Sequence, residues 1–203
     1  MRSIAASFIC LSLATAFPSA AQTVSRDPAQ APGGTYTADA GHTQVLFSLL
    51  HLGLTDYYGR FDRISGTLNY DPSQPERSTL DITIDTTSLD TTSDRLNNEL
   101  KTVFRAQQYP GATFRSTSVT RTGPNTGRVD GVLTIDDVTK PVALNVTFNG
   151  SEKNPMGGGY ALGFQATTTI RRSDFGLNKA MWSPYVGDDV KLIIEAMFDQ
   201  KPG

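Results

Sequence analysis

A strict alternation of apolar and polar residues through the stretch His42–Tyr70 constrains the fold of this chain most. In its first half, Val45, Phe47 and Leu49 fall on one face of an extended chain. A turn at residues 52–59, which contains Gly53, Asp56 and Gly59, separates this half from a second half at residues 63–70 with the same alternation. Period-two alternation on both sides of a glycine-containing turn is typical of a half-buried antiparallel hairpin. The stretch therefore predicts two neighbouring strands of a sheet with one buried face.

The same alternation returns along most of the remaining chain. It covers residues 79–85, 112–122, 127–136, 139–150, 160–170 and 189–199. About eight strands of this kind predict an all-β fold, an eight-stranded antiparallel barrel, because closing the sheet removes its exposed edges. A two-layer β-sandwich produces the same alternation and stays open as the alternative. The interior of an eight-stranded barrel has room either for its own side chains or for one small ligand.

One segment follows a helical period instead. Ser93 is suited to cap a helix of sequence DRLNNELKTVFR, and the chain reaches a proline at Pro110 soon afterwards. The apolar stripe of this amphipathic helix is formed by Leu96, Leu100, Val103 and Phe104. A single amphipathic helix among strands is expected to cover an opening, because its stripe needs a partner. The stripe fits equally a plug that fills the barrel and a wall that lines a ligand cavity.

The first 21 residues have the anatomy of a secretory signal peptide. A positive start at Arg2 precedes an apolar core at residues 4–17, which is shorter than the roughly 20 residues of a membrane span. Small residues before Gln22 provide a cleavage site. We therefore expect export, with a periplasmic location in a bacterial envelope. Residues 22–34, with two prolines and two glycines, predict a flexible lead-in to a single barrel domain at residues 35–201.

The composition excludes several classes of function. The single cysteine, Cys10, falls inside the predicted signal peptide, and the net charge of −2 is scattered without a basic block for nucleic acid. His42 and His51 lie at opposite ends of one predicted strand, too far apart for a shared metal site. The chain has no G-x-S-x-G or H-E-x-x-H motif. We expect no catalytic residue, no metal and no cofactor.

Short motifs along the chain match one known family, in order and at plausible spacing. The first motifs are Tyr36–Asp39 followed by His42, and Phe47 followed by residues 51–53. Residues 59–61 with Gly66 and residues 109–110 with residues 113–117 come next. The last are residues 131–135 with residues 138–142, residues 172–176 and residues 190–196. On these motifs the chain resembles the YceI-like proteins, exported lipocalin-like barrels associated with polyisoprenoid lipids. In one departure, Asp136 and Asp137 stand where we expect a glycine in that family, which alters a turn.

The resemblance implies a lipocalin-like barrel that encloses a long apolar chain, such as an isoprenoid quinone or a polyprenyl lipid. Its function would be that of a non-catalytic binding or carrier protein. A membrane-protein partner and a homodimer stay open. Two other functions also remain: an enzyme acting on a lipid-like substrate with His51 or Asp174 as general base, and a ligand-free barrel acting through its outer surface.

The residues predicted to contact the lipid come from the inward faces of the strands, the helix stripe and the polar ends of the barrel. They are Val45, Phe47, Leu49, His51, Ile64, Leu80, Ile82, Ile84, Leu96, Leu100, Val103, Phe104, Phe164, Arg172 and Trp182. His51 fits a residue that orders its turn as well as a donor to a head group. Arg171, Arg172 and Asp174 fit an ion pair at a barrel end as well as a head-group site. Trp182 and Tyr185 suit a half-exposed rim.

Overall fold

The computed structural model describes residues 24–155, 158–180 and 183–200. The strands in these residues are β1 (Gly34–Ala38), β2 (Gln44–His51), β3 (Thr55–Phe61), β4 (Ile64–Tyr70), β5 (Thr79–Asp85), β6 (Leu89–Asp90), β7 (Gly111–Arg121), β8 (Thr126–Ile135), β9 (Val138–Lys153), β10 (Tyr160–Arg171) and β11 (Val186–Gln200). The α-helix is α1 (Asp94–Val103), and short 3₁₀ turns join several of the strands.

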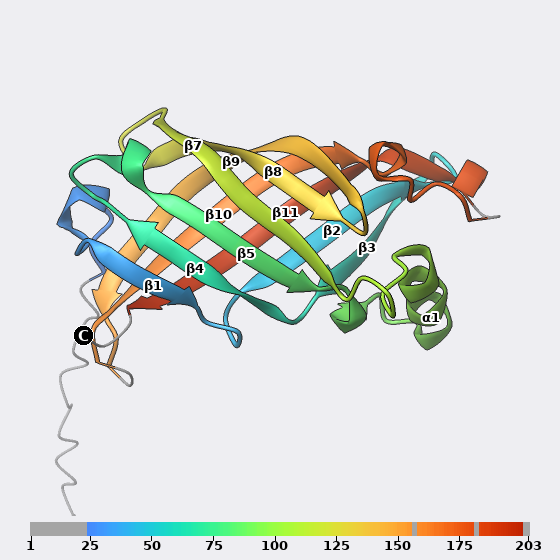
Figure 1. The fold of residues 1–203 in the computed structure, drawn as a ribbon, viewed down its shortest axis with the longest axis horizontal. Helices are drawn as coiled ribbons and strands as arrows, with labels where there is room; N and C mark the ends of the chain where they lie inside the picture. Colours follow the sequence, from blue (N-terminus) through green and yellow to red (C-terminus); the bar gives the residue numbers. More distant parts are fainter. Residues whose placement is uncertain (1–23, 156–157, 181–182, 201–203) are drawn as a thin grey trace, which may run out of the picture.

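The strands form one closed antiparallel barrel (Figure 1). The sheet runs in the order β1-β4-β5-β7-β8-β9-β10-β11 and closes where β1 pairs with β11. β2 continues β1 along β11, since Ala38 lies opposite Phe198 and Gln44 lies opposite Glu195. In the same way β3 and β6 extend β4 and β5 at one end of the barrel. The predicted eight-stranded barrel with one helix is therefore confirmed, and closure rules out the sandwich.

The break between β3 and β4 is held by a buried serine. The N–H groups of Asp62 and Arg63 both donate to the hydroxyl of Ser88, at 3.1 and 3.0 Å. Backbone donors that leave a sheet need another acceptor when they are partly buried. Ser88 supplies that acceptor, so the long strand bends without leaving the two N–H groups unsatisfied.

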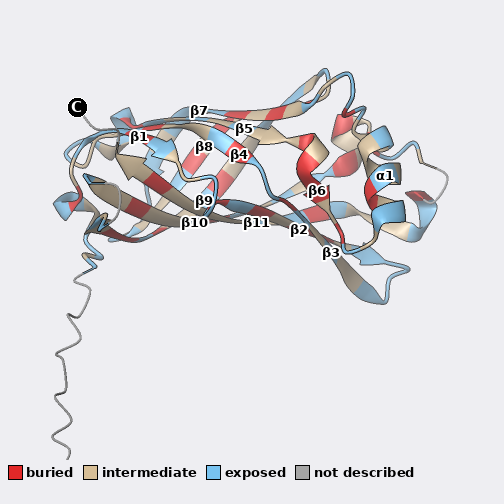
Figure 2. Cartoon of the chain, turned by 90° about the horizontal axis from the view of Figure 1, so that it is seen from below, coloured by how far each residue is buried: buried red, intermediate tan, exposed pale blue. Residues whose placement is uncertain are grey.

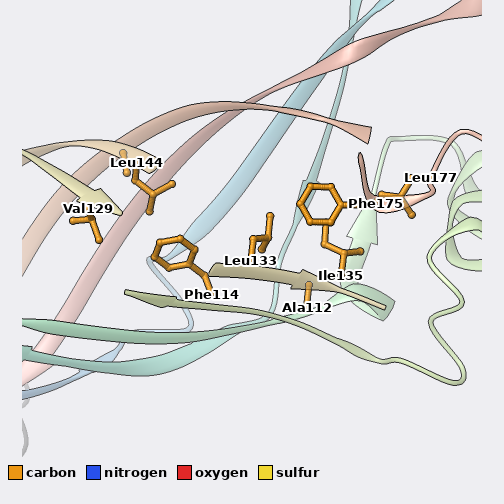
Figure 3. Packing of buried hydrophobic residues seen from close by; sticks show 9 residues of the cluster. Ala112, Phe114, Val129, Leu133, Ile135, Leu144, Phe175 and Leu177 are labelled. Carbon is orange, nitrogen blue, oxygen red and sulfur yellow. The ribbon is translucent and has the colours of Figure 1, made fainter. Parts of the chain in front are cut away.

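Alternation places the apolar residues inside the barrel, as the sequence predicts. Figure 3 shows Phe114 of β7 and Leu133 and Ile135 of β8 in one buried cluster, with Phe175 beside Ile135. The core is divided along the barrel. A second cluster around Tyr36 and neighbouring aromatic residues fills the end opposite α1.

Helix α1 lies across the other end of the barrel (Figure 1). Ser93 caps it as predicted, because its hydroxyl accepts from the N–H of Leu96 at 3.4 Å. The helix ends at Val103, two residues before the end of the predicted segment, since Arg105 has a left-handed φ of 44°. Arg105 then binds Asp136 at 3.0 Å and also binds Asp137, which ties the end of the helix to the β8–β9 turn.

That turn explains how the chain does without the glycine expected there. Asp136 has a φ of 56°, in the left-handed region that glycine adopts most easily. Aspartate tolerates this region better than most residues. Its carboxylate is nearly buried and bonded to Arg105, so this position holds both the turn and the helix end.

The described part of the predicted flexible lead-in is packed against the barrel, which corrects the expectation from composition. Ser25 forms a β-bridge with Ser151, and Ala31 is 2% exposed. The hydroxyls of Tyr36 and Tyr70 donate to the carbonyls of Pro32 and Pro28, at 2.7 and 2.8 Å. Burial raises the pKa of Tyr70 to about 12. The proline and glycine content of the segment could not predict these contacts, because the contacting residues are distant in sequence. The predicted signal peptide lies outside the described residues.

Candidate functional site

The barrel contains a cavity of about 700 Å³ that opens at the α1 end. Its walls are the inward faces of β2, β3 and β11, together with the apolar stripe of α1. The lining is dominated by aliphatic and aromatic side chains, with a few polar residues at the mouth. Concave, mostly apolar spaces of 300–1,000 Å³ are typical of small-molecule sites. We call this space the upper cavity.

Aromatic rings shape one wall of the upper cavity. The ring of Phe47 lies over Gly59 on the neighbouring strand, and the ring centroids of Phe47 and Phe61 are 5.7 Å apart. Phe104, at the end of α1, meets Phe61 edge to face, also at 5.7 Å. These contacts connect the helix end to β2 and β3 and hold the wall in place.

The helix stripe lines the upper cavity without filling it. Leu96, Leu100, Val103 and Phe104 all belong to the lining, and each of them is half-buried. At the edge of the stripe, Asn97 is buried and accepts from both the N–H and the hydroxyl of Thr91, at 2.8 and 2.7 Å. The geometry therefore favours a helix that forms a wall of the cavity over a helix that fills the barrel.

A second, smaller cavity of about 220 Å³ lies toward the other end of the barrel. We call it the lower cavity. Phe164 stands in its lining, with its ring centroid 5.3 Å from that of Phe148 and 6.1 Å from that of Phe198. The two cavities share four lining residues: Val45, Ile84, Leu133 and Leu192. The two apolar cavities therefore adjoin each other inside the barrel.

The structure places all the described predicted contact residues on these two cavities. The upper cavity is lined by Val45, Phe47, Leu49, His51, Ile84, Leu96, Leu100, Val103, Phe104 and Arg172. The lower cavity is lined by Ile64, Leu80, Ile82 and Phe164, together with the shared Val45 and Ile84. Trp182 lies outside the described residues. Contact between these residues and a lipid stays a prediction.

Arg172 is a buried cation beside the upper cavity, 8% exposed. It donates to the carbonyls of Gly187, Leu177, Ser183 and Val186, at 2.8 to 3.2 Å, and to the hydroxyl of Ser183. These five bonds use every N–H group of the guanidinium. Arg172 therefore organises the segment that follows β10.

The predicted ion pair of this region involves the neighbouring arginine only. Arg171 binds Asp174 at 3.2 Å on the surface, and Asp174 belongs to neither cavity lining. Asp188 accepts from the N–H and the hydroxyl of Ser173, at 3.0 and 2.6 Å, and the hydroxyl contact lowers the pKa of Asp188. Asp188 and Asp189 lie in β11, where its pairing with β2 is irregular.

The mouth of the upper cavity is built by the β2–β3 turn and the 3₁₀ turn Ser183–Tyr185. His51 ends β2 with an exposed side chain in the lining, and its carbonyl accepts from the N–H of Leu54 at 3.0 Å. The N–H of Leu52 donates to the carbonyl of Tyr185 at 2.7 Å, which joins the two turns. Within residues 24–155, 158–180 and 183–200, no three His, Cys, Asp or Glu side chains could hold a metal ion together.

Several cavity residues were absent from the predicted set. In the upper cavity they are Leu52, Tyr57, Phe61, Ser93, Arg95, Glu99, Ala112, Leu133, Ile135, Ile170, Leu177, Tyr185, Val186, Val190 and Leu192. Alternation alone could have found Ile170, Val190 and Leu192, since it places them on inward faces. Tyr185 was expected at a rim but not in the contact set, and Leu177 follows no period, so only the folded chain reveals its position.

The match to known proteins covers most of the barrel. A family model described as the YceI-like domain matches residues 36–198. The chain belongs to the YceI-like family. A YceI-like relative, described as a UPF0312 protein of Pseudomonas savastanoi pv. phaseolicola, is 37% identical over 175 residues, which are 84% of this chain and 86% of the relative.

Two solved structures share the fold. Burkholderia cenocepacia BcnA has a TM-score of 0.71 at 24% identity, over 79% of this chain and 98% of BcnA. A polyisoprenoid binding domain from Saccharophagus degradans, described as implicated in plant cell wall breakdown, has a TM-score of 0.61 at 16% identity, over 82% of this chain and 98% of that domain. At these identities the likeness of this YceI-like chain to both proteins is one of fold.

Proposed function

We propose that this YceI-like protein binds and carries a long-chain isoprenoid lipid, a quinone or a polyprenyl lipid, inside its barrel. The observation that carries the proposal is the apolar upper cavity, about 700 Å³ in volume and open at one end. Its lining continues into the lower cavity through four shared residues, so a chain could extend along the barrel axis. The similar fold of a domain described as polyisoprenoid binding supports the same ligand class.

The tail of such a ligand would contribute more to affinity than its head. Burial of one methylene group contributes about 0.8 kcal/mol, whereas a neutral hydrogen bond contributes about 1 kcal/mol. A lipid of ~40 carbons at ~0.3 kcal/mol per atom reaches about −12 kcal/mol, a nanomolar affinity. Affinity should therefore rise with chain length and depend weakly on the head group. Equal affinity for short and long isoprenoids with the same head would contradict enclosure.

Enclosure without reaction fits the placement of the polar groups. Asp174, one of the two candidate bases, is bonded to Arg171 away from both cavities. His51 is at the mouth and remains the residue through which an enzyme would have to act. In a carrier, His51→Ala leaves lipid binding intact and no turnover is detected in either form. Turnover by the native protein that His51→Ala abolishes would favour the enzyme.

We place this carrier in the periplasm, on the basis of the apolar core and cleavage site in its first 21 residues. The deciding experiment is native mass spectrometry of the mature protein purified from its own envelope, followed by organic extraction. A stoichiometric long-chain isoprenoid is the expected result. A protein that is empty, and stays empty after incubation with quinones and polyprenyl lipids, would favour a function of the outer surface.

A further inference from the structure

Exposed apolar side chains gather at the mouth of the upper cavity. The structure describes seven large hydrophobic residues with high exposure, and five of them belong to the β2–β3 hairpin or to the Ser183–Tyr185 turn bonded to it: Leu50, Leu52, Leu54, Tyr58 and Tyr185. Leu54 is 79% exposed and Tyr58 is 61% exposed. We call these five residues the rim patch. Scattered single apolar residues are ordinary on a surface, but a cluster marks an interaction site.

The rim patch stands out from the barrel. Figure 2 shows the β2–β3 hairpin projecting beyond the wall at the α1 end. Leu52 has a left-handed φ of 54°, which is costly for a leucine, and Gly53 follows with a φ of 69°. A side chain at position 53 would meet nothing within 4 Å. The space around the tip is therefore open, and the side chain of Leu54 extends largely into solvent.

The rim patch is continuous with the cavity. Leu52 and Tyr185 belong both to the patch and to the lining of the upper cavity. The hydrogen bond from the N–H of Leu52 to the carbonyl of Tyr185, 2.7 Å long, keeps the two residues together. An apolar chain leaving the cavity would pass directly over the patch.

Three ion pairs lie near the mouth. Lys191 binds Asp56 at 3.3 Å, Arg171 binds Asp174 at 3.2 Å, and Arg95 binds Glu99 at 3.0 Å. The acidic pair Asp188 and Asp189 follows Gly187, which lies against Leu50, so the surface around the patch has no basic field. Leucine and tyrosine side chains match the interfacial region of a bilayer, where aromatic rings with a polar tip are favoured.

We propose that the rim patch docks on the surface of a phospholipid bilayer, with the β2–β3 tip inserted among the head groups. Docking sets the mouth of the upper cavity against the membrane. The identity of the chain that then moves into the barrel rests on the function proposed above. A long isoprenoid crossing open water would expose every methylene group that the bilayer and the barrel bury, and contact at the mouth avoids this exposure.

Vesicle flotation tests the docking. The mature protein is mixed with phosphatidylcholine vesicles and compared with Leu54→Asp/Tyr58→Asp, since neither residue lines a cavity. Ile193→Asp is the matched control, because Ile193 is an exposed apolar residue on the β11 wall between Thr167 and Leu46. We expect the double variant to bind at least tenfold more weakly. The control should match the native protein, and binding should change little between low and high salt.

Native protein that stays with the buffer, or a double variant that floats equally well, would overturn the docking. The docking would also be wrong if the native protein did not bind vesicles but formed a dimer, and the double variant were monomeric. The patch would then contact a second copy of the chain. Loss of binding in high salt would likewise count against it, since it would indicate adsorption through charge.

A second measurement separates docking from lipid enclosure. Isoprenoid binding is measured in detergent solution, and isoprenoid transfer is measured from vesicles. We expect the double variant to bind normally in detergent and to take up lipid from vesicles at least tenfold more slowly. If neither the native protein nor the double variant binds isoprenoid in detergent, the proposed function is wrong. If both bind normally and take up lipid from vesicles at equal rates, only the docking is wrong. Equal melting temperatures establish that the variants are folded.

Discussion

A Cβ atom on residue 59 would lie 2.3 Å from Cζ of Phe47, so the Phe47 ring occupies the space that Gly59 leaves free. The two residues face each other on β2 and β3. This contact keeps the ring against the wall and out of the upper cavity. The absence of one side chain therefore helps to keep the cavity open.

The Gly59→Ala substitution should push the Phe47 ring toward the cavity. We expect unfolding free energy to fall by about 1–3 kcal/mol, the usual effect of overpacking, and lipid capacity to fall with it. Urea denaturation and lipid titration measure the two effects. Adding Phe47→Leu to Gly59→Ala should recover part of both, because the smaller side chain leaves room for the methyl group. Additive losses in the double variant would contradict the contact.

The helix wall is tested with Leu100→Asp/Val103→Asp. Two carboxylates facing an apolar cavity would lose hydration on ligand binding without gaining a partner. We expect lipid uptake to fall at least tenfold while the far-ultraviolet circular dichroism of the sheet is kept. Asn98→Asp/Thr102→Asp adds the same charge on the exposed face of α1 and should bind normally. Normal uptake by the folded cavity variant would show that α1 is not part of the ligand path.

Arg172 and Arg171 are adjacent in sequence but should differ in their effect on stability. Arg172→Met removes five hydrogen bonds and leaves buried carbonyls unsatisfied, which should cost about 3 kcal/mol or more of unfolding free energy. Arg171→Met removes a surface ion pair and should cost about 0–1 kcal/mol. Thermal and urea unfolding compare them. Equal losses of unfolding free energy in the two variants would mean that Arg172 does not organise the segment that follows β10.

Acid should weaken the same segment through Asp188. The hydroxyl of Ser173 lowers the pKa of Asp188 below its ordinary value of 3.8. A carboxyl group with a lowered folded pKa stabilises the fold above its unfolded pKa, and this stabilisation is lost as pH falls through the folded pKa. Asp188→Asn should thus be less stable than the native protein at pH 7, and the difference should shrink below about pH 4.

Asp189→Asn is the control for this pH dependence, because Asp189 is exposed beside Asp188. Its stability should follow that of the native protein at every pH. Unfolding by urea at a series of pH values provides the measurement. A constant difference between Asp188→Asn and the native protein down to pH 3 would exclude the carboxylate of Asp188 as the acid-sensitive group.

Most of the secondary structure was predictable because its signals are local. The turn predicted at residues 52–59 was wrong, since most of that segment belongs to strand β3, Thr55–Phe61, which pairs with β2. The side chains of a strand alternate between two faces, so Val45, Phe47 and Leu49 had to share a face wherever the strand lay. The stripe from Leu96 to Phe104 was readable for the same reason. The kinks that divide long strands into β1 and β2, or β3 and β4, have no such signal, since they depend on a distant acceptor such as Ser88.

The site was only partly predictable. The inward residues of the strands were found because a barrel buries one face of every strand. The bonds of Arg172 to backbone carbonyls, and the packing of residues 24–33 under Tyr36 and Tyr70, were not found. Charge and composition suggested an ion pair and a flexible segment instead. Both arrangements depend on which chain segments meet, and composition carries no information about that.

The sequence by itself determined antiparallel strands with one apolar face and one amphipathic helix, because periodicity sets the direction of each side chain. Only the tertiary structure decided that the sheet closes where β1 pairs with β11, that the interior keeps a cavity of about 700 Å³ and that Leu52 meets Tyr185 at its mouth. The physical reason is that empty space and contacts between distant residues follow from how the elements pack, and packing is a property of the whole chain.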